Sequence, residues 1–309
     1  MGIDHGSPKR LRSSRGVALC VALTGVGLLL AGTGTAAFAS APSARPAVKI
    51  PTPPKDPMVA ALVPKSIRAK GSVSVAMDAT YAPDEFVAAN GTTIIGMDAD
   101  FNTALGAVMG IKWHGVNATF DTIITGLTSG KYQVGNSSFT VTTAREKKVN
   151  FVTYFKAGEA FYVASSSSLK LSGLTSLCGR SVSVEIGTTE QSDAQNTVKT
   201  CRKAGKKPDT VLSFSTQSEA NLAVSSGRAD IGFADSQVAG YIVEQSRGHF
   251  KLDGAAFEVA PYGFAFPKSS GLDKATLAAV KVLMKDGIYS KILDKWGVQT
   301  GSINNPAIN

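Results

Sequence analysis

A group of small hydroxyl side chains followed by one arginine is the segment of this sequence that most directly suggests chemistry. Ser137, Ser138 and Thr140 precede Arg145 by five to eight residues. A guanidinium group suits a carboxylate because its planar fork forms two parallel hydrogen bonds, and neutral hydroxyl groups can complete the site. The alternative is that Arg145 opens the charged run Arg-Glu-Lys-Lys, which is typical of a solvated surface. The segment therefore predicts a carboxylate site only if the rest of the chain supports one.

Residues 1–39 have the features of a secretory signal peptide. A basic region at residues 9–15 precedes an apolar segment from Val17 to Ala31, and Ala37-Phe38-Ala39 resembles a cleavage site. The apolar segment is shorter than the roughly 20 residues of a membrane-spanning helix, although small residues extend it and an uncleaved anchor stays open. Cys20 lies within the apolar segment, so we expect no lipid-attachment cysteine. The chain is predicted to be exported to the cell surface or secreted.

Charge and cysteine content argue against nucleic acid and metal ions as partners. The formal net charge of +9 falls to +6 when the four basic residues and one acidic residue of the predicted signal are removed. The basic run at 199–207 lacks interleaved aromatic residues, so no nucleic-acid partner is expected. The two remaining cysteines, Cys178 and Cys201, predict a disulfide in an exported protein. His114 and His249 are isolated, and we expect neither a metal site nor a cofactor.

The order of the remaining segments predicts an α/β fold. Seven prolines between residues 40 and 65 predict an extended, Pro-rich linker, with the folded part beginning near Ser66. Alternating strands and helices then predict a parallel sheet covered on both faces. An Asn90-Gly91 pair between two apolar runs indicates a β-hairpin. Strands are expected at 73–77, 112–116, 133–135, 149–155, 161–165, 182–186, 210–214, 231–234 and 262–266, and helices after Asp98 and at 120–127, 188–202, 218–225, 236–245, 272–284 and 287–296.

Eight motifs in this order resemble one protein family. Together the motifs span roughly residues 68–297, and they resemble the extracytoplasmic solute-binding proteins of ABC importers. The resemblance is to the branch that binds polar amino acids, solute-binding protein family 3, in its actinobacterial-type form. The motifs are DATYAPDEF (78–86), GMDADF (96–101), ATFDTIITGLTSGKY (118–132), SSFTVTTAREKKVNFVTYF (137–155), GRSVSVEIGTTEQ (179–191), SGRADIGFAD (226–235), YGFAFPK (262–268) and DGIYSKILDKWG (286–297).

The resemblance implies a periplasmic-binding-protein-like fold of two α/β lobes joined by two crossover hinge strands. Lobe 1 is expected at residues 66–156 and 257–309, and lobe 2 at residues 157–256. Such proteins close on their ligand by a hinge motion. The implied function is non-enzymatic binding of a polar amino acid and its delivery to the membrane permease of an ABC transporter, by a protein that we expect to be a monomer.

The resemblance also implies a role for each candidate ligand-binding residue. Arg145 is expected to clamp the α-carboxylate of the ligand and Asp235 to pair with the α-ammonium group. An acidic residue, Asp78, is expected to face the ligand side chain, and two aromatic rings to sandwich the ligand. The aromatic residues are Tyr81 and Phe120, and the hydroxyl residues expected to complete the site are Ser137, Ser138, Thr140, Thr188 and Thr189.

Structural alternatives exist for several of these residues. Thr188 or Thr189 could merely cap the following helix, although free N–H groups at a helix start also favour an anion. Asp235 could cap its own following helix, and the two aromatic residues could belong to the core. Asp84 stands where the family often has phenylalanine; it could face the ligand, and we expect it to face solvent.

Two other functions use the same fold. An enzyme of the cyclohexadienyl or arogenate dehydratase type would need a proton donor, for which Glu85, Glu190 and His114 are the nearby candidates. A ligand-sensing receptor would need a separate signalling partner. Neither alternative has a motif of its own in the sequence.

Overall fold

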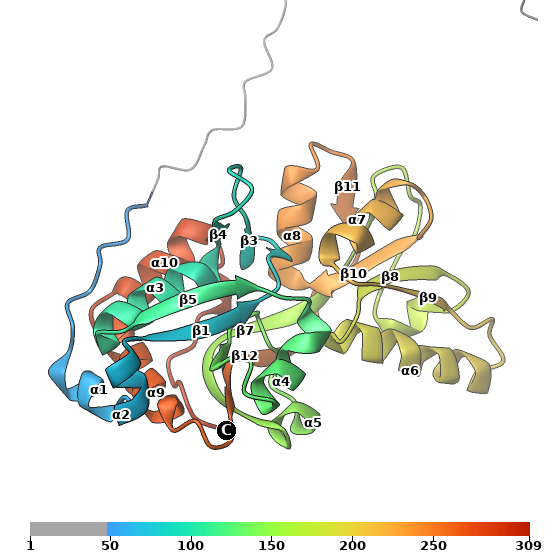
Figure 1. Cartoon of the computed structure of the whole chain (residues 1–309). Helices are drawn as coiled ribbons and strands as arrows, with labels where there is room; N and C mark the ends of the chain where they lie inside the picture. Colours follow the sequence, from blue (N-terminus) through green and yellow to red (C-terminus); the bar gives the residue numbers. More distant parts are fainter. Residues whose placement is uncertain (1–47) are drawn as a thin grey trace, which may run out of the picture. The chain divides into compact units, whose positions relative to one another are not determined.

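The computed structural model describes residues 48–309, so the predicted signal peptide lies outside the described residues. Figure 1 shows the described elements in two groups, each with its own strands and covering helices. None of the helices in this range is both long and apolar enough to cross a membrane. The first group contains β1 (Ser72–Met77), β5 (Lys112–Asn117), β6 (Val134–Gly135), α3 (Met97–Met109), α4 (Phe120–Thr128), α5 (Thr143–Glu146), α9 (Leu272–Lys285) and α10 (Ile288–Trp296).

The second group follows the strand–helix alternation predicted from the sequence. Its strands β8, β9 and β10 are parallel to one another, and the helices between them connect one strand to the next. The elements are the 3₁₀-helix η1 (Leu174–Leu177), β8 (Ser181–Glu185), α6 (Thr189–Lys203), β9 (Thr210–Phe214), α7 (Gln217–Ser225), β10 (Ile231–Asp235), α8 (Ser236–Gln245) and β11 (Phe250–Leu252).

Two long antiparallel strands, β7 (Val149–Ala164) and β12 (Phe257–Pro267), run through both groups. β7 is a single strand where two separate strands were predicted, and its side chains enter both hydrophobic cores. Tyr154 packs in the first core, whereas Tyr162 packs in the second. The predicted two-lobed fold with crossover strands is therefore confirmed, and Figure 1 shows β7 and β12 between the two groups.

The sheet is mixed, so the prediction of a parallel sheet was wrong in this respect. The strand order is β5-β1-β6-β12-β7-β10-β8-β9, and β11 pairs with β7. β5, β1 and β6 are parallel to one another, as are β10, β8 and β9, whereas every pair that involves β7 or β12 is antiparallel. The β7–β12 pair is antiparallel because the chain crosses from one lobe to the other on β7 and returns on β12.

Part of the segment predicted as an extended linker is helical. α1 (Pro57–Leu62) and α2 (Lys65–Lys70) precede β1, and Asp56 caps α1 by accepting hydrogen bonds from two of its backbone N–H groups. Val59 and Val63 are 3% and 2% exposed and belong to the first core. Proline is favoured in the first turn of a helix, so Pro57 starts α1 and does not prevent it.

Two local predictions agree with the structure. β3 (Glu85–Val87) and β4 (Ile94–Ile95) form the hairpin expected around Asn90-Gly91, and β3 also pairs with β2 (Thr80–Tyr81). Cys178 and Cys201 form a disulfide with their Cα atoms 5.6 Å apart, which ties the segment before β8 to α6. A last 3₁₀-helix, η2, spans Gln299–Gly301.

Candidate functional site

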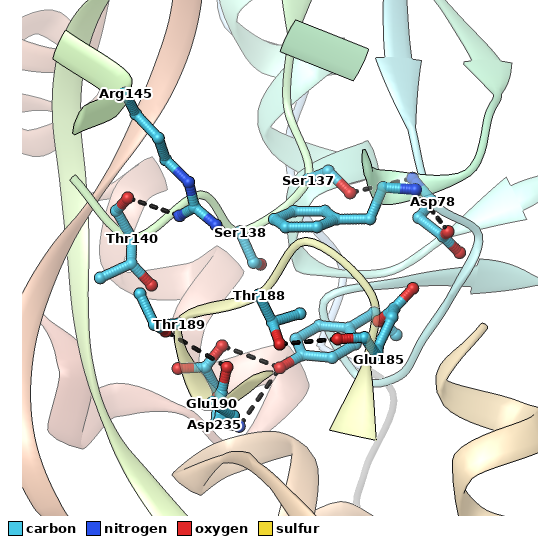
Figure 2. A pocket seen from close by; sticks show the side chains of 12 residues that line it. Asp78, Ser137, Ser138, Thr140, Arg145, Glu185, Thr188, Thr189, Glu190 and Asp235 are labelled. Carbon is cyan, nitrogen blue, oxygen red and sulfur yellow. Dashed lines mark hydrogen bonds between the residues drawn. The ribbon is translucent and has the colours of Figure 1, made fainter. Parts of the chain in front are cut away.

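One cavity brings together all ten candidate ligand-binding residues, which lie far apart in the sequence (Figure 2). Two further acidic residues, Glu185 and Glu190, also line it. The candidate residues are Asp78, Tyr81, Phe120, Ser137, Ser138, Thr140, Arg145, Thr188, Thr189 and Asp235.

Arg145 points into this cavity, so the alternative that it belongs to a solvated charged run is wrong. It sits on the short helix α5, and its backbone N–H is capped by the Thr142 hydroxyl. Its two terminal nitrogens donate to the carbonyl oxygens of Thr140 (2.7 Å) and Gly187 (2.9 Å). The guanidinium carbon lies 5.3 Å from the centre of the Phe120 ring. Burial lowers the pKa of Arg145, but a guanidinium group stays protonated in proteins.

Gly187 makes the close approach between the lobes possible at this point. Its φ of +86° is a conformation that side chains rarely adopt. A Cβ atom here would lie 3.0 Å from the Cα of Asp121, which belongs to α4 of the first lobe. Because the Gly187 carbonyl accepts from Arg145, the same residue holds both lobes at the cavity.

Asp235 ends β10 with its side chain directed toward the first lobe. Its Oδ2 atom accepts a hydrogen bond from the Tyr81 hydroxyl (2.8 Å), and it makes no capping hydrogen bond to α8. The capping alternative is therefore wrong. Burial raises the pKa of Asp235 to about 6, while hydrogen bonds from Tyr262 and Tyr81 and the charge of Arg145 oppose the shift.

Ser137 and Ser138 are engaged by a buried acidic cluster behind the cavity. The Ser137 hydroxyl donates to Glu85 (2.6 Å), and the Ser138 hydroxyl donates to Asp84 (2.9 Å). Ser138 has φ of +47°, and its backbone N–H donates to Asp98 (2.9 Å). These carboxyl groups therefore hold the turn that carries both serines.

Asp84 was expected to face solvent, and this expectation was wrong. Its side chain is fully buried, and its Oδ2 atom also accepts from Gln237 (2.7 Å) of the second lobe. Burial and the neighbouring Asp98 raise the pKa of Asp84 well above its usual range. The Ser138 hydroxyl and the Gln237 amide both donate to Oδ2, whereas Oδ1 has no hydrogen-bond partner among residues 48–309. Asp84 does not line the cavity.

The threonines combine structural and cavity-facing roles. Thr188 caps α6 by accepting from the Gln191 N–H (3.1 Å), as the capping alternative held, and its hydroxyl donates to the Glu185 carbonyl (2.8 Å). Thr189 donates to Glu190 (3.2 Å). All of these residues surround the start of α6, where free N–H groups and the helix dipole favour an anion.

Glu185 and Glu190 were not among the ligand-binding residues predicted from the sequence. Glu185 is 2% exposed and Glu190 is 1% exposed, and each has one carboxylate oxygen without a hydrogen-bond partner among residues 48–309. Both flank the Gly187-Thr188-Thr189 segment that the sequence did indicate. Their position beside that segment could have indicated that they line the cavity, but only the hydroxyl groups of Thr188 and Thr189 were considered as candidates. Of the acids considered for an enzyme, Glu190 lines the cavity, whereas Glu85 and His114 do not.

The cavity has two chemically distinct ends. Figure 2 shows Arg145 and Thr140 on one side, together with Asp235 and Glu190, while Asp78 and Glu185 lie on the other. Burial raises the pKa of both the Asp78 and the Glu185 carboxyl groups, and the negative charge of Asp78 raises that of Glu185 further.

Asp78 is anchored from its own lobe as well. It accepts hydrogen bonds from the Thr80 hydroxyl (2.7 Å) and the Phe120 N–H (2.9 Å). These bonds fix the carboxylate at the end of β1, facing the other lobe. Asp78 from the first lobe and Glu185 from the second therefore both line this end of the cavity.

The cavity is nearly closed. Its volume is about 10 Å³, which is room for roughly one water molecule. Polar groups of the two lobes satisfy one another across it, as in the Tyr81–Asp235 and Arg145–Gly187 hydrogen bonds. A larger molecule can enter only if the lobes part.

Comparison with known proteins agrees with this architecture. Residues 73–299 match the family model described as bacterial extracellular solute-binding proteins, family 3. The arginine-binding protein ArgT of Corynebacterium glutamicum is 31% identical over 254 residues, which is 82% of this chain and 83% of that protein.

Two solved structures have the same fold. An ancestral arginine-binding protein bound to arginine is 34% identical, with a TM-score of 0.67 over 73% of this chain and 98% of that one. The ancestral amino acid-binding protein AncCDT-1, a precursor of cyclohexadienyl dehydratase, is 31% identical, with a TM-score of 0.67 over 75% and 97%. The chain belongs to the bacterial extracellular solute-binding proteins of family 3.

Proposed function

We propose that this protein binds a free amino acid with a cationic side chain outside the cytoplasm and delivers it to the permease of an ABC transporter. The lobes would be residues 66–156 with 257–309 and residues 157–256, closing about β7 and β12. A separate hydrophobic cluster in each lobe supports this division.

The α-carbon end of the ligand fits the end of the cavity that contains Arg145. Its guanidinium would exchange the Gly187 carbonyl for the α-carboxylate, which is the stronger acceptor because it is charged. Asp235 would accept from the α-ammonium group, with Thr140 and Thr189 as neutral partners. In this arrangement the zwitterion replaces the hydrogen bonds that the lobes otherwise make to each other.

The cationic class is supported by one observation: Asp78 and Glu185 line the cavity on the side away from Arg145, and neither forms a salt bridge with a basic side chain of residues 48–309. One guanidinium and four carboxyl groups line the cavity. A zwitterion uses the guanidinium and one or two of the acids, and the Asp78–Glu185 pair is left for the side chain. A guanidinium or ammonium group would let both acids ionise, because an opposite charge favours the charged form. The arginine-binding relatives agree with this assignment.

Calorimetry with L-arginine and L-citrulline tests the proposal. The two ligands differ chiefly in charge, so citrulline should bind at least about tenfold more weakly, since a hydrogen bond to a charged group contributes about 1.5–3 kcal/mol. Glu185→Gln should narrow that difference, and Glu244→Gln, an exposed control, should not. The protein must first be unfolded and dialysed to remove carried-over ligand.

The outcomes of these experiments test the cationic ligand class and the amino-acid-binding function separately. Equal affinity for citrulline or glutamine would refute the cationic class and leave amino-acid binding intact. A lack of binding to every common amino acid would refute the receptor function. Incubation with prephenate and arogenate tests the dehydratase alternative, in which Glu190 would be the proton donor, and product formation would show that the protein is an enzyme.

A further inference from the structure

Three acidic side chains of the second lobe converge outside the amino-acid cavity. Glu159 of β7, Asp193 of α6 and Glu258 of β12 each offer a carboxylate oxygen, and these oxygens all lie within 4.8 Å of one another. The three residues come from separate elements, so the folded chain brings them together. None of them lines the cavity described above.

The buried member of this cluster is aimed at it without a full set of partners. The Glu159 side chain is 5% exposed, and its Oε2 atom has no hydrogen-bond partner in residues 48–309. The one ion pair among these residues joins Lys295 to Asp100, so no basic side chain is paired with the cluster. A buried carboxylate oxygen without a donor is costly unless a cation or a proton supplies the missing interaction.

We propose that Glu159, Asp193 and Glu258 form a binding site for a divalent cation with a preference for oxygen ligands, and that Ca²⁺ is the ion that fits it best. Each of the three carboxylates offers one oxygen to the cluster, and water can complete the six to eight ligands that Ca²⁺ accepts in flexible geometry. Mg²⁺ demands a tighter octahedron and retains its waters, so it is the weaker candidate. Thiolate and imidazole ligands, which softer metals prefer, are absent from the cluster.

A cation at this position would join three elements that meet beside the amino-acid cavity. Glu159 lies opposite Asp235 in the pairing of β7 with β10, and opposite Phe257 in the pairing with β12. Asp193 lies on α6 one turn after Thr189 and Glu190, which line the cavity. The ion would therefore hold the start of α6 against both crossover strands.

A proton is the competing way to relieve the repulsion between these acids. Burial, with the charges of Asp193 and Asp235, raises the pKa of Glu159 to about 8. A protonated Glu159 can donate to Asp193 and partly satisfy the pair. A bound cation would displace that proton, so the two explanations predict different responses to Ca²⁺.

The test uses the full exported chain, freed of ions with a chelator and dialysed into buffer at pH 7.5. Titration with CaCl₂ in a calorimeter should give a dissociation constant of about 10⁻⁴–10⁻³ M, the range of extracellular Ca²⁺ sites. Thermal unfolding in 10 mM CaCl₂ should occur at a higher temperature than in MgCl₂ at the same concentration.

Glu258→Gln is the most informative variant because Glu258 is exposed and its replacement leaves the core intact. It should weaken Ca²⁺ binding at least tenfold, and Asp193→Asn should do the same. Glu244→Gln, an exposed glutamate on α8, should bind Ca²⁺ as the wild type does. A wild-type protein that gives no heat and no thermal shift with Ca²⁺ would overturn the proposal, as would an unchanged affinity in Glu258→Gln. Arginine binding, measured separately, distinguishes this failure from failure of the proposed function.

Discussion

At the scale of single residues, polar groups from the two lobes form hydrogen bonds with each other across the cavity. Arg145 donates to the Gly187 carbonyl, and Tyr81 donates to Asp235, so each lobe supplies a partner for the other. These bonds give Arg145 and Asp235 partners, whereas Glu185 and Glu190 each keep one oxygen without a partner among residues 48–309. An amino acid could take over these hydrogen bonds, but a cavity of about 10 Å³ can admit one only after the lobes have moved apart.

Replacing Arg145 by alanine tests the residue on which the α-carboxylate depends. Arg145→Ala should weaken amino-acid binding at least about thirtyfold, because losing one partner of a desolvated charge pair costs roughly 2–5 kcal/mol and each 1.4 kcal/mol is tenfold. Isothermal titration calorimetry measures the effect. Lys147→Ala, which removes an exposed positive charge from the same run, is the matched control. Wild-type affinity in Arg145→Ala would exclude Arg145 from the site.

At the scale of elements, the sequence predicts best where the chain alternates strand and helix within one lobe. The prediction of helices at 188–202 and 236–245 is correct to about one residue, because a strand, a turn and an amphipathic pattern mark each boundary. The prediction fails where an element is stabilised by contacts with residues that are distant in the sequence. The prolines around α1 hid a helix that Asp56 caps and the core stabilises.

The site shows the same division. Residue types and the family resemblance predicted Arg145, Thr188 and Thr189, and the structure places all three at the cavity. Glu185 was not predicted to line the cavity, because only the hydroxyl groups of the neighbouring segment were considered and its proximity to Asp78 depends on the tertiary fold. The burial of Asp84 was also unpredictable, since it depends on Gln237, more than 150 residues away in the sequence.

The disulfide belongs to this scale because it closes a loop over β8 and most of α6. Changing Cys178 and Cys201 together to alanine should lower the free energy of unfolding by about 3 kcal/mol, since the open loop gives the unfolded chain more conformations. Urea denaturation of the wild type and of the variant, with and without reductant, measures the loss. A loss below about 1 kcal/mol, or a reductant effect in the variant, would contradict this account.

At the scale of the whole molecule, buried acids make the unliganded protein sensitive to pH. Burial raises the pKa of Glu159 to about 8 and the pKa values of Asp98 and Asp235 to about 6. A carboxyl group with a raised pKa binds more protons in the folded chain than in the unfolded chain. Its stabilising contribution is therefore complete below its unfolded pKa and is lost as pH rises through the folded value.

The free energy of unfolding without ligand or divalent ions should therefore fall as pH rises from about 5 to about 8. Urea titrations at intervals of one pH unit, in the presence of a chelator, measure this dependence. Glu159→Gln should flatten the upper part of the curve, between about pH 6 and pH 8, because the amide does not titrate. A stability that increases with pH over this range would contradict the burial of these acids.

Gly187 also determines how closely the two lobes can approach each other. Even a methyl group at this position would lie too close to the backbone of Asp121 in the first lobe, so any other residue would hold the two lobes further apart. With the lobes further apart, the hydrogen bond from Arg145 to the carbonyl of residue 187 would be lost. Such a variant would close less completely, and we expect it to bind a solute more weakly.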